Sequence, residues 1–174
     1  MLIAAPGDPM EVRACMRYLV KNPQPSYLRL GKAGEPLVHT EVPEVLPGKW
    51  LRIRDGGKGR ATYLTTGTTL SLVNQLLAKN PKLDSFSLRS MPLWSMKAKV
   101  VQPPQVENFE SVITVEDHLM DGGFGSWFLE ATSIRPDLLT SIKIKALDSE
   151  VCDMVARQST MNAQGGLTEE MLCE

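Results

Sequence analysis

Glu116, Asp117 and His118 are three consecutive residues whose types could do acid–base chemistry. A carboxylate acts as a general acid or base, and a histidine beside carboxylates has a pKa that its surroundings adjust around neutrality. Neighbouring residues at the end of a strand point in different directions, however, so these side chains need not converge on one substrate atom. We therefore favour a hydrogen-bonded structural turn over a catalytic pair, and we assign no catalytic residue.

A glycine-rich run follows, in which Gly122, Gly123 and Gly125 precede a segment with helical spacing of Phe124, Phe128 and Ala131. Backbone N–H groups at the start of a helix can bind phosphate, because glycine permits close approach and the helix dipole attracts an anion. The same glycines permit a turn at positive φ and close packing of the helix. The spacing is not that of a nucleotide-binding loop and no P-loop lysine follows, so we favour the structural role.

Positive charge lies at a second place, where Arg29 and Lys32 come at and after the end of a predicted strand. From the residues alone, these are ordinary solvated charges at the end of a strand. The segment from Thr65 to Thr69 lies at a strand-to-helix turn, a position where open α/β sheets often bind ligands. Threonine there also caps helices, which is the role we favour.

The composition disfavours several partners and sites. Nineteen basic and twenty acidic residues, with no basic run, give no electrostatic signature for nucleic acid or an anionic membrane. No apolar stretch approaches the roughly 20 residues that span a bilayer, and the first residues lack the features of a signal peptide. We therefore expect a cytoplasmic protein. Cys15, Cys152 and Cys173, with two histidines, show no metal-ligand spacing, so we expect reduced thiols and no metal site.

Strands and helices alternate along the chain. Asp8 as N-cap, Pro9 at the first helical position and Glu11 as the capping-box acid predict a helix at 9–21. With strands at 2–5 and 26–30 it forms a βαβ unit, whose further sheet partners must come from elsewhere because one helix cannot cover both faces. Residues 36–47 contain three prolines and predict an extended connection. Beyond it, strands are expected at 50–54, 61–65, 83–88, 112–115 and 138–146, and helices at 70–79, 103–109, 124–131, 150–158 and after Thr168.

This alternation predicts an α/β fold with three layers, αβα, around a largely parallel sheet. Two details belong to that prediction. The strands at 50–54 and 61–65 are expected to pair as a hairpin, and residues 91–101 are expected to form an irregular connection.

The segment from Thr114 to Glu130, TVEDHLMDGGFGSWFLE, closely resembles the signature of the C-terminal domain of the transketolase family of thiamine diphosphate enzymes. The stretches APGDPMEVRA and PSYLRLGKAGEP are similar to the last portion of the pyrimidine-binding domain of that family. The resemblance implies a fragment of that domain at 1–35, a linker at 36–47 and a transketolase C-terminal domain at 48–174.

The resemblance also implies roles for particular residues. The segment with Glu116, Asp117, His118 and the three glycines would lie near domain and subunit contacts. The strand end at Arg29 and Lys32 would help to bind a substrate phosphate. Position 32 matches a family arginine, and its lysine keeps the charge without the planar guanidinium that grips phosphate at two points.

The cofactor machinery of the family is missing from the sequence. The family binds Mg²⁺ and the diphosphate around a Gly-Asp-Gly motif, which does not occur in this chain. Its glutamate for the aminopyrimidine ring lies upstream of the part that resembles residues 1–36. The resemblance thus implies the C-terminal section of an enzyme that transfers ketol units between sugars, inactive as this isolated chain and binding neither thiamine diphosphate nor Mg²⁺ alone. It would act as a homodimer or with a missing N-terminal cofactor-binding subunit. The alternative is a free-standing dimerisation or regulatory module without catalysis.

Overall fold

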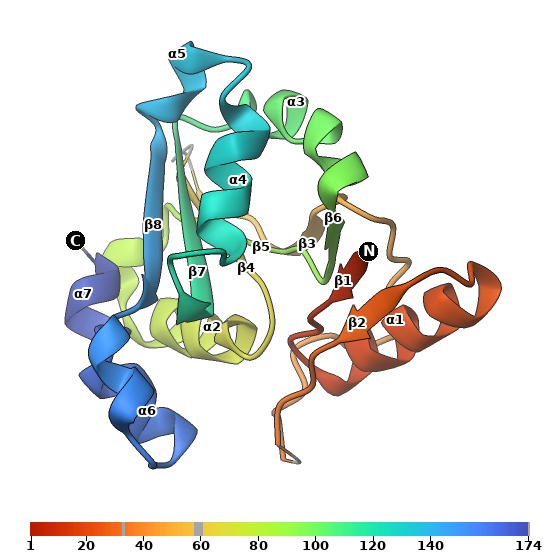
Figure 1. Cartoon of the computed structure of the whole chain (residues 1–174). Coiled ribbons are helices and arrows are strands. Elements are labelled where there is room, and N and C mark those ends of the chain that lie inside the picture. Colours follow the sequence, from red (N-terminus) through yellow and green to blue (C-terminus); the bar gives the residue numbers. More distant parts are fainter. Residues whose placement is uncertain (33, 58–60, 174) are drawn as a thin grey trace.

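The structure is a computed structural model that describes residues 1–32, 34–57 and 61–173. It contains two sheets, one with five strands and one with three (Figure 1). The five-stranded sheet has the order β3-β5-β4-β7-β8. Its strands are β3 (Leu51–Arg54), β4 (Ala61–Thr65), β5 (Ser87–Ser90), β7 (Ser111–Leu119) and β8 (Ile142–Leu147). Strands β5, β4, β7 and β8 run parallel, and the edge strand β3 is antiparallel to β5.

Apolar side chains alternate between the two faces of the five-stranded sheet, and each face is covered. Tyr63 of β4 lies in a core with helix α2 (Thr69–Lys79) and with Leu172 of α7 (Glu169–Cys173). Its neighbour Leu64 lies in the opposite core with helix α4 (Phe124–Thr132) and the end of α3 (Pro103–Val106). The predicted three-layer α/β fold with a largely parallel sheet is therefore confirmed.

The three-stranded sheet holds the N-terminal βαβ unit. Strand β1 (Leu2–Ala4) pairs in parallel with β2 (Ser26–Leu28), and α1 (Pro9–Lys21) connects them. The predicted unit is thus confirmed. Its third strand, β6 (Leu93–Ser95), pairs with β1 in the antiparallel sense and comes from the second half of the chain. The prediction of an irregular connection at 91–101 was wrong, since β6 and the 3₁₀ helix η2 (Met96–Val101) occupy it.

Buried acidic residues at the start of α1 fasten the connection between the two units. Asp8 is the N-cap of α1, and its carboxylate also accepts hydrogen bonds from the backbone N–H groups of Val38 (3.0 Å) and His39 (2.8 Å). Glu11, which is fully buried, accepts a 2.6 Å hydrogen bond from the Gly7 N–H. The His39 ring lies between them, with Nδ1 3.2 Å from Asp8 and Nε2 3.8 Å from Glu11. The extended segment is therefore held against α1 by specific polar contacts.

Other sequence-based boundaries need correction. The hairpin of β3 and β4 was wrong, because β5 lies between them and the Arg89 guanidinium donates to the Arg54 carbonyl across the β3–β5 edge. The strand expected from 83 begins only at Ser87, after the 3₁₀ helix η1 (Pro81–Leu83). The strand expected from 138 begins at Ile142, after α5 (Pro136–Leu139).

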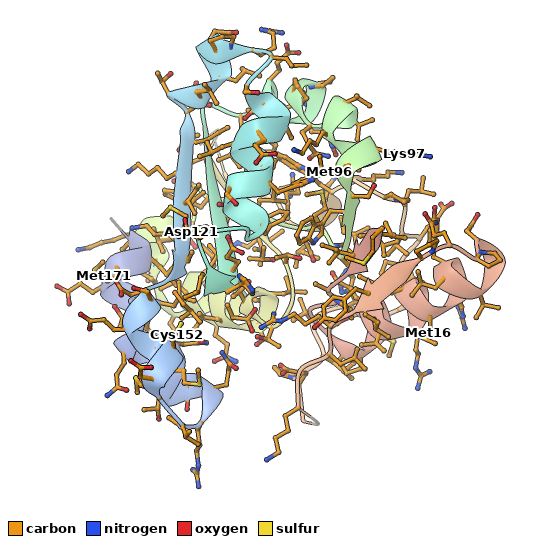
Figure 2. All side chains as sticks on the ribbon, viewed as in Figure 1. Met16, Met96, Lys97, Asp121, Cys152 and Met171 are labelled. Carbon is orange, nitrogen blue, oxygen red and sulfur yellow. The ribbon has the colours of Figure 1, made fainter. Side chains whose placement is uncertain are left out.

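The C-terminal segment also differs from the prediction. Instead of one helix at 150–158, the chain forms η3 (Ser149–Asp153), capped by Asp148, and α6 (Gln158–Gln164). Met154 and Arg157 between them have extended backbone angles, so no continuous helix is possible. Thr168 accepts a hydrogen bond from the Met171 N–H at the start of α7, as expected of a cap. Cys152 and Met171 lie at the surface here (Figure 2).

Among the described residues, no helix is long and apolar enough to cross a membrane. In the same part of the chain, no group of three or more His, Cys, Asp or Glu side chains is arranged to hold a metal ion.

Candidate functional site

The three ionisable residues of the signature lie inside strand β7, which continues to Leu119. The turn expected at 116–118 was therefore wrong. Glu116 and Asp117 are buried and His118 is exposed. The two carboxylates have separate partners, on α4 and on the N-terminal unit. The His118 Nδ1 lies 3.0 Å from the Leu119 carbonyl, and within the described ranges no hydrogen bond joins it to either carboxylate.

Glu116 binds the first turn of helix α4. Its Oε2 accepts a hydrogen bond from the Phe124 N–H (2.6 Å), and its Oε1 accepts one from the Gly125 N–H (2.7 Å). These N–H groups have no acceptor within the helix, and the helix dipole favours negative charge there. The N–H groups that a phosphate would need are thus already bound by a carboxylate of the same chain.

The three glycines serve this arrangement in different ways. Only Gly122 has a positive φ, at 70°, so the expectation of positive φ was wrong for Gly123, whose φ is −81°. A Cβ at Gly123 would overlap the Leu119 carbonyl oxygen and Oε2 of Glu116. A Cβ at Gly125 would lie 2.5 Å from Cγ2 of Ile144 on β8. Close approach of the backbone, rather than turn conformation, is what requires glycine at these two positions.

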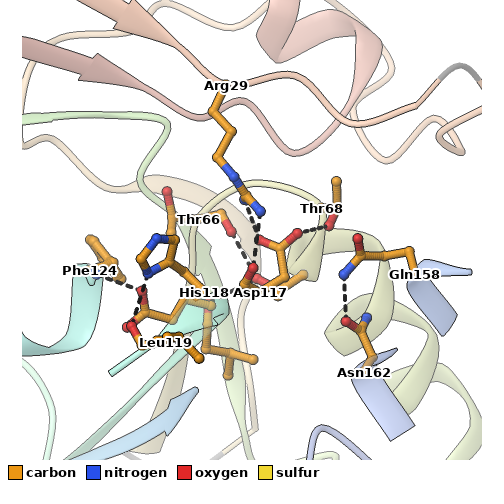
Figure 3. A network of polar contacts seen from close by, with 12 residues as sticks. Arg29, Thr66, Thr68, Asp117, His118, Leu119, Phe124, Gln158 and Asn162 are labelled. Atoms are coloured by element: carbon orange, nitrogen blue, oxygen red, sulfur yellow. Dashed lines mark hydrogen bonds and ion pairs between the residues drawn. The ribbon is translucent and has the colours of Figure 1, made fainter. Parts of the chain in front are cut away.

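Asp117 binds the N-terminal unit (Figure 3). Its Oδ1 lies 2.5 Å from NH1 of Arg29, and its backbone carbonyl accepts from NH2 at 3.0 Å. Its Oδ2 accepts a 2.7 Å hydrogen bond from the Thr68 hydroxyl. The Arg29 side chain is about a third exposed and the Asp117 side chain almost fully buried. This ion pair joins residues that are far apart in the sequence.

The ion pair lies at the switch point of the five-stranded sheet, where the direction of the strand order reverses. From β4 the chain passes through α2 to β5 on one side, and it then returns across β4 to β7 on the other side. Such a switch point, at the carboxyl ends of the strands, is where open α/β sheets commonly bind ligands. Here the N-terminal unit covers it, since the Gly67 N–H also donates to the Ala5 carbonyl at 2.8 Å. Thr68, which has no side-chain cap bond to α2, binds Asp117 instead.

Arg29 and Lys32, the candidates for phosphate binding, do not line one cavity. Arg29 lines a cavity of about 120 Å³ at the junction of the two sheets. Lys32 is exposed and lines a separate groove of about 340 Å³ beside the start of α1, together with Arg13 and Glu35. The structure therefore does not bring these two side chains together in one cavity.

Sequence reasoning missed three features of this site. The pairing of Arg29 with Asp117 had no local signal, because 88 positions separate them. The role of Glu116 as the cap of α4 could have been suggested by an acid shortly before a glycine-rich helix start. The cluster of Asp8, Glu11 and His39 was only half recognised, since the N-cap was predicted and the contact to the connection was not.

Burial of Glu116 gives a testable dependence of stability on pH. Burial raises the pKa of Glu116 from 4.5 to about 7, although the Gly125 and Phe124 N–H groups oppose the rise. A carboxyl that binds its proton more tightly in the folded state adds stability below its unfolded pKa and loses it as pH rises through the folded value. We expect the free energy of unfolding to fall by about 1–3 kcal/mol between pH 4.5 and 7.5 through this group.

Urea unfolding at a series of pH values measures this fall. Burial also raises the pKa of Glu11 to about 7, so the wild-type slope contains both groups. Glu116→Gln should flatten part of the slope, whereas the exposed control Glu170→Gln should keep it. An unchanged slope in Glu116→Gln would contradict the assignment.

The sequence shows similarity to curated proteins over most of its length, although no family model matches it. It is 26% identical over 169 residues to 1-deoxy-D-xylulose-5-phosphate synthase of Thermus thermophilus, covering 94% of this chain and 26% of that protein. It is 27% identical over 128 residues to one subunit of the apulose-4-phosphate transketolase of Actinobacillus succinogenes, covering 74% of this chain and 41% of that subunit. These similarities support a relationship to the transketolase family.

The fold agrees with this relationship. A split-gene transketolase, described as an inactive β4 tetramer, superposes with a TM-score of 0.79 at 20% identity, over 99% of this chain and 54% of that one. The likeness shows a transketolase-type α/β fold. The chain spans about a quarter of the synthase and less than half of the apulose-4-phosphate transketolase subunit.

Proposed function

We propose that the chain is the C-terminal section of a transketolase-like, thiamine diphosphate-dependent enzyme that transfers ketol units between sugars. In this proposal residues 1–35 are the end of a pyrimidine-binding domain, 36–47 a linker and 48–174 the C-terminal domain. The cofactor and Mg²⁺ bind elsewhere in the complete enzyme, and the isolated chain is inactive.

One observation supports the proposal that the cofactor binds outside this chain. The switch-point crevice of the five-stranded sheet is covered by the chain's own Arg29, which binds Asp117. The α4 N-terminus is likewise bound by Glu116. The two places in this fold best suited to a phosphorylated cofactor are thus bound by protein groups, which supports a cofactor site outside this chain, on a partner subunit or on another part of the same enzyme. Two similar proteins, one named as a transketolase subunit and the other as a split-gene transketolase, support such a partner.

The partner has an exposed surface available on the N-terminal unit. The outer edge of β2 has no strand beside it among the described residues, and Tyr27 on that strand is 54% exposed. An open strand edge with an exposed aromatic side chain favours pairing with another chain. We propose that a cofactor-binding subunit, or a second copy of this chain, contacts this edge.

Calorimetric titration with thiamine diphosphate and Mg²⁺ tests the proposal. The chain alone should show no saturable binding. A mixture with a candidate cofactor-binding subunit from the same source should bind the cofactor and convert a ketose phosphate donor and an aldose acceptor. Micromolar cofactor affinity of the chain alone would contradict the proposed division. If no such subunit confers ketol transfer, and sedimentation shows a stable homodimer, the free-standing module is the better description.

A further inference from the structure

A histidine between two buried carboxylates fastens the connection at residues 36–47 to helix α1. His39 of the connection directs Nδ1 toward Oδ2 of Asp8, at 3.2 Å, and Nε2 toward Oε1 of Glu11, at 3.8 Å. Both carboxylates are buried at the start of α1, and the His39 side chain is 12% exposed. Because Asp8 also accepts hydrogen bonds from the Val38 and His39 N–H groups, the ring and the backbone of the connection depend on the same cluster.

This cluster needs one shared proton. A neutral imidazole carries one N–H and one lone pair, and an ionised carboxylate only accepts hydrogen bonds. The Nδ1 nitrogen therefore donates to Asp8, and the contact between Nε2 and Glu11 is favourable when a proton lies on one of these two groups. Without that proton, the Nε2 lone pair faces a buried negative charge, and Glu11 becomes a second buried negative charge near Asp8.

The two atoms on either side of this contact have no other partner. Oε1 of Glu11 and Nε2 of His39 are both buried, and no described residue forms a hydrogen bond with either atom. Buried polar atoms without a partner are costly and uncommon in folded proteins. Their separation of 3.8 Å is slightly longer than a hydrogen bond, so the proton between them is held less firmly than the one between Nδ1 and Asp8.

The groups of the cluster itself make this proton easy to lose near neutral pH. Burial raises the pKa of Glu11 from 4.5 to about 7, and the charge of Asp8 adds to the rise. The Ser90 hydroxyl, the Gly7 N–H and the charge of His39 oppose it. Burial also acts to raise the pKa of Asp8, but its backbone N–H partners lower it below its usual value, so Asp8 keeps its negative charge.

The other ionisable groups around the cluster do not replace this proton. On the next turn of α1, burial raises the pKa of the Cys15 thiol to about 12, so the thiol stays neutral. Strand β5 contributes the neutral Ser90 hydroxyl. On its outer side the His39 ring lines a groove with three exposed charged side chains, those of Glu41, Glu44 and Arg52. Water and salt screen these exposed charges, so the buried groups decide the charge of the cluster.

We propose that the proton shared by His39 and Glu11 is a pH-sensitive latch. While the proton is present, the latch fastens the connection to the start of α1, and its loss as the pH rises releases Val38 and His39 from Asp8. The release is local, because the pairing of β1 with β6 and the Arg29–Asp117 ion pair hold the N-terminal unit separately. The proposal is independent of ketol transfer, because it needs neither the cofactor nor a partner subunit.

Amide hydrogen exchange of the whole chain at about pH 5 and about pH 8 measures the release. After correction for intrinsic exchange rates, protection of the Val38 and His39 amides should fall by roughly tenfold or more. The sign follows from the raised pKa of Glu11, since such a carboxyl stabilises the closed latch at low pH and loses that effect as the pH rises through about 7. The Gly67 amide, which binds the Ala5 carbonyl, should lose less protection.

This comparison decides the proposal on the wild-type protein alone. No loss of protection at Val38 and His39 would overturn the latch. An equal loss at Gly67 would overturn it as well, because the opening would then involve the whole junction and not the connection.

Two variants that each remove a buried carboxyl assign the effect to Glu11. The amide of Glu11→Gln donates to Nε2 without titrating, so Val38 and His39 should keep their protection at both pH values. Glu116→Gln removes a carboxyl of raised pKa on β7, outside the cluster, and should leave the fall in protection unchanged. Circular dichroism confirms that each variant is folded. If Glu11→Gln keeps the fall, or Glu116→Gln removes it, the latch is wrong.

Discussion

Gly123→Val should lower the free energy of unfolding by about 3 kcal/mol or more, the upper part of the range for overpacking a well-packed site. The reason is space. The new side chain would overlap the Leu119 carbonyl and the Glu116 carboxylate, so Glu116 would have to leave the N–H groups of α4. A buried carboxylate would then lose its partners, which adds to the cost of the overlap.

Gly122→Ala is the matched control, since it tests backbone conformation without overlap. The φ of 70° at this position is unfavourable for alanine, but a Cβ there meets no atom within 4 Å. We expect a loss of about 1 kcal/mol for this variant. Urea unfolding of both proteins measures the difference. Equal losses would show that backbone conformation, and not the contact with Glu116, decides the need for glycine at 123.

The same proteins test whether the turn binds anions. Because Glu116 holds the Phe124 and Gly125 N–H groups, added phosphate should not raise the melting temperature in a saturable way. A saturable rise in the wild type that disappears in Gly123→Val would contradict the structural role of the turn.

Arg29→Met should be the second most damaging change, with a loss of about 2–4 kcal/mol in the free energy of unfolding. Methionine keeps much of the side-chain volume and removes the charge, so Asp117, which is 5% exposed, loses its cation. This expected loss of stability is smaller than that for a fully buried ion pair, because Arg29 is about a third exposed and partly screened by water.

Two further variants separate charge from geometry. Arg29→Lys keeps the charge but cannot reach both the Asp117 carboxylate and its carbonyl, so it should be intermediate. Arg52→Met removes a surface arginine that pairs with Asp55 and should change stability by less than about 0.5 kcal/mol. Hydrogen exchange at the Gly67 amide, which binds Ala5, reports whether the N-terminal unit has separated from the sheet. Wild-type protection and stability in Arg29→Met would show that the pair does not hold the junction.

The sequence predicted features that depend on local chemistry. The helix at 9–21 was marked by Asp8, Pro9 and Glu11, and the strand at 61–65 by its β-branched and aromatic residues, and both have the predicted bounds. Strand β6 could not be predicted in this way. Its three residues pair with β1 across a long separation in sequence, and no local periodicity records such a partner.

The candidate site shows the same distinction between features set by local sequence and features set by long-range contacts. The close packing of the helix after the glycines follows from residue type, and the structure confirms it at Gly125. The partners of Glu116 and Asp117 depend on which elements meet at the end of β7. Glu116 bonds to residues eight and nine positions away, and Asp117 to Arg29 and Thr68, so only the assembled fold brings these groups together.

The pairing of β6 with β1 also affects how the chain folds during its synthesis. Strand β1 leaves the ribosome long before its partner β6, since Ala4 of β1 pairs with Leu93, which lies much later in the sequence. Until the later segment emerges, the nascent N-terminal unit exposes an open strand edge and part of its apolar face, which are features that chaperones and aggregation both recognise. A gene division within 36–47 would place the two paired strands on different polypeptides. Any workable division of this gene would therefore have to keep the codons of β1 and β6 in one reading frame, or let the two products assemble through that strand pair.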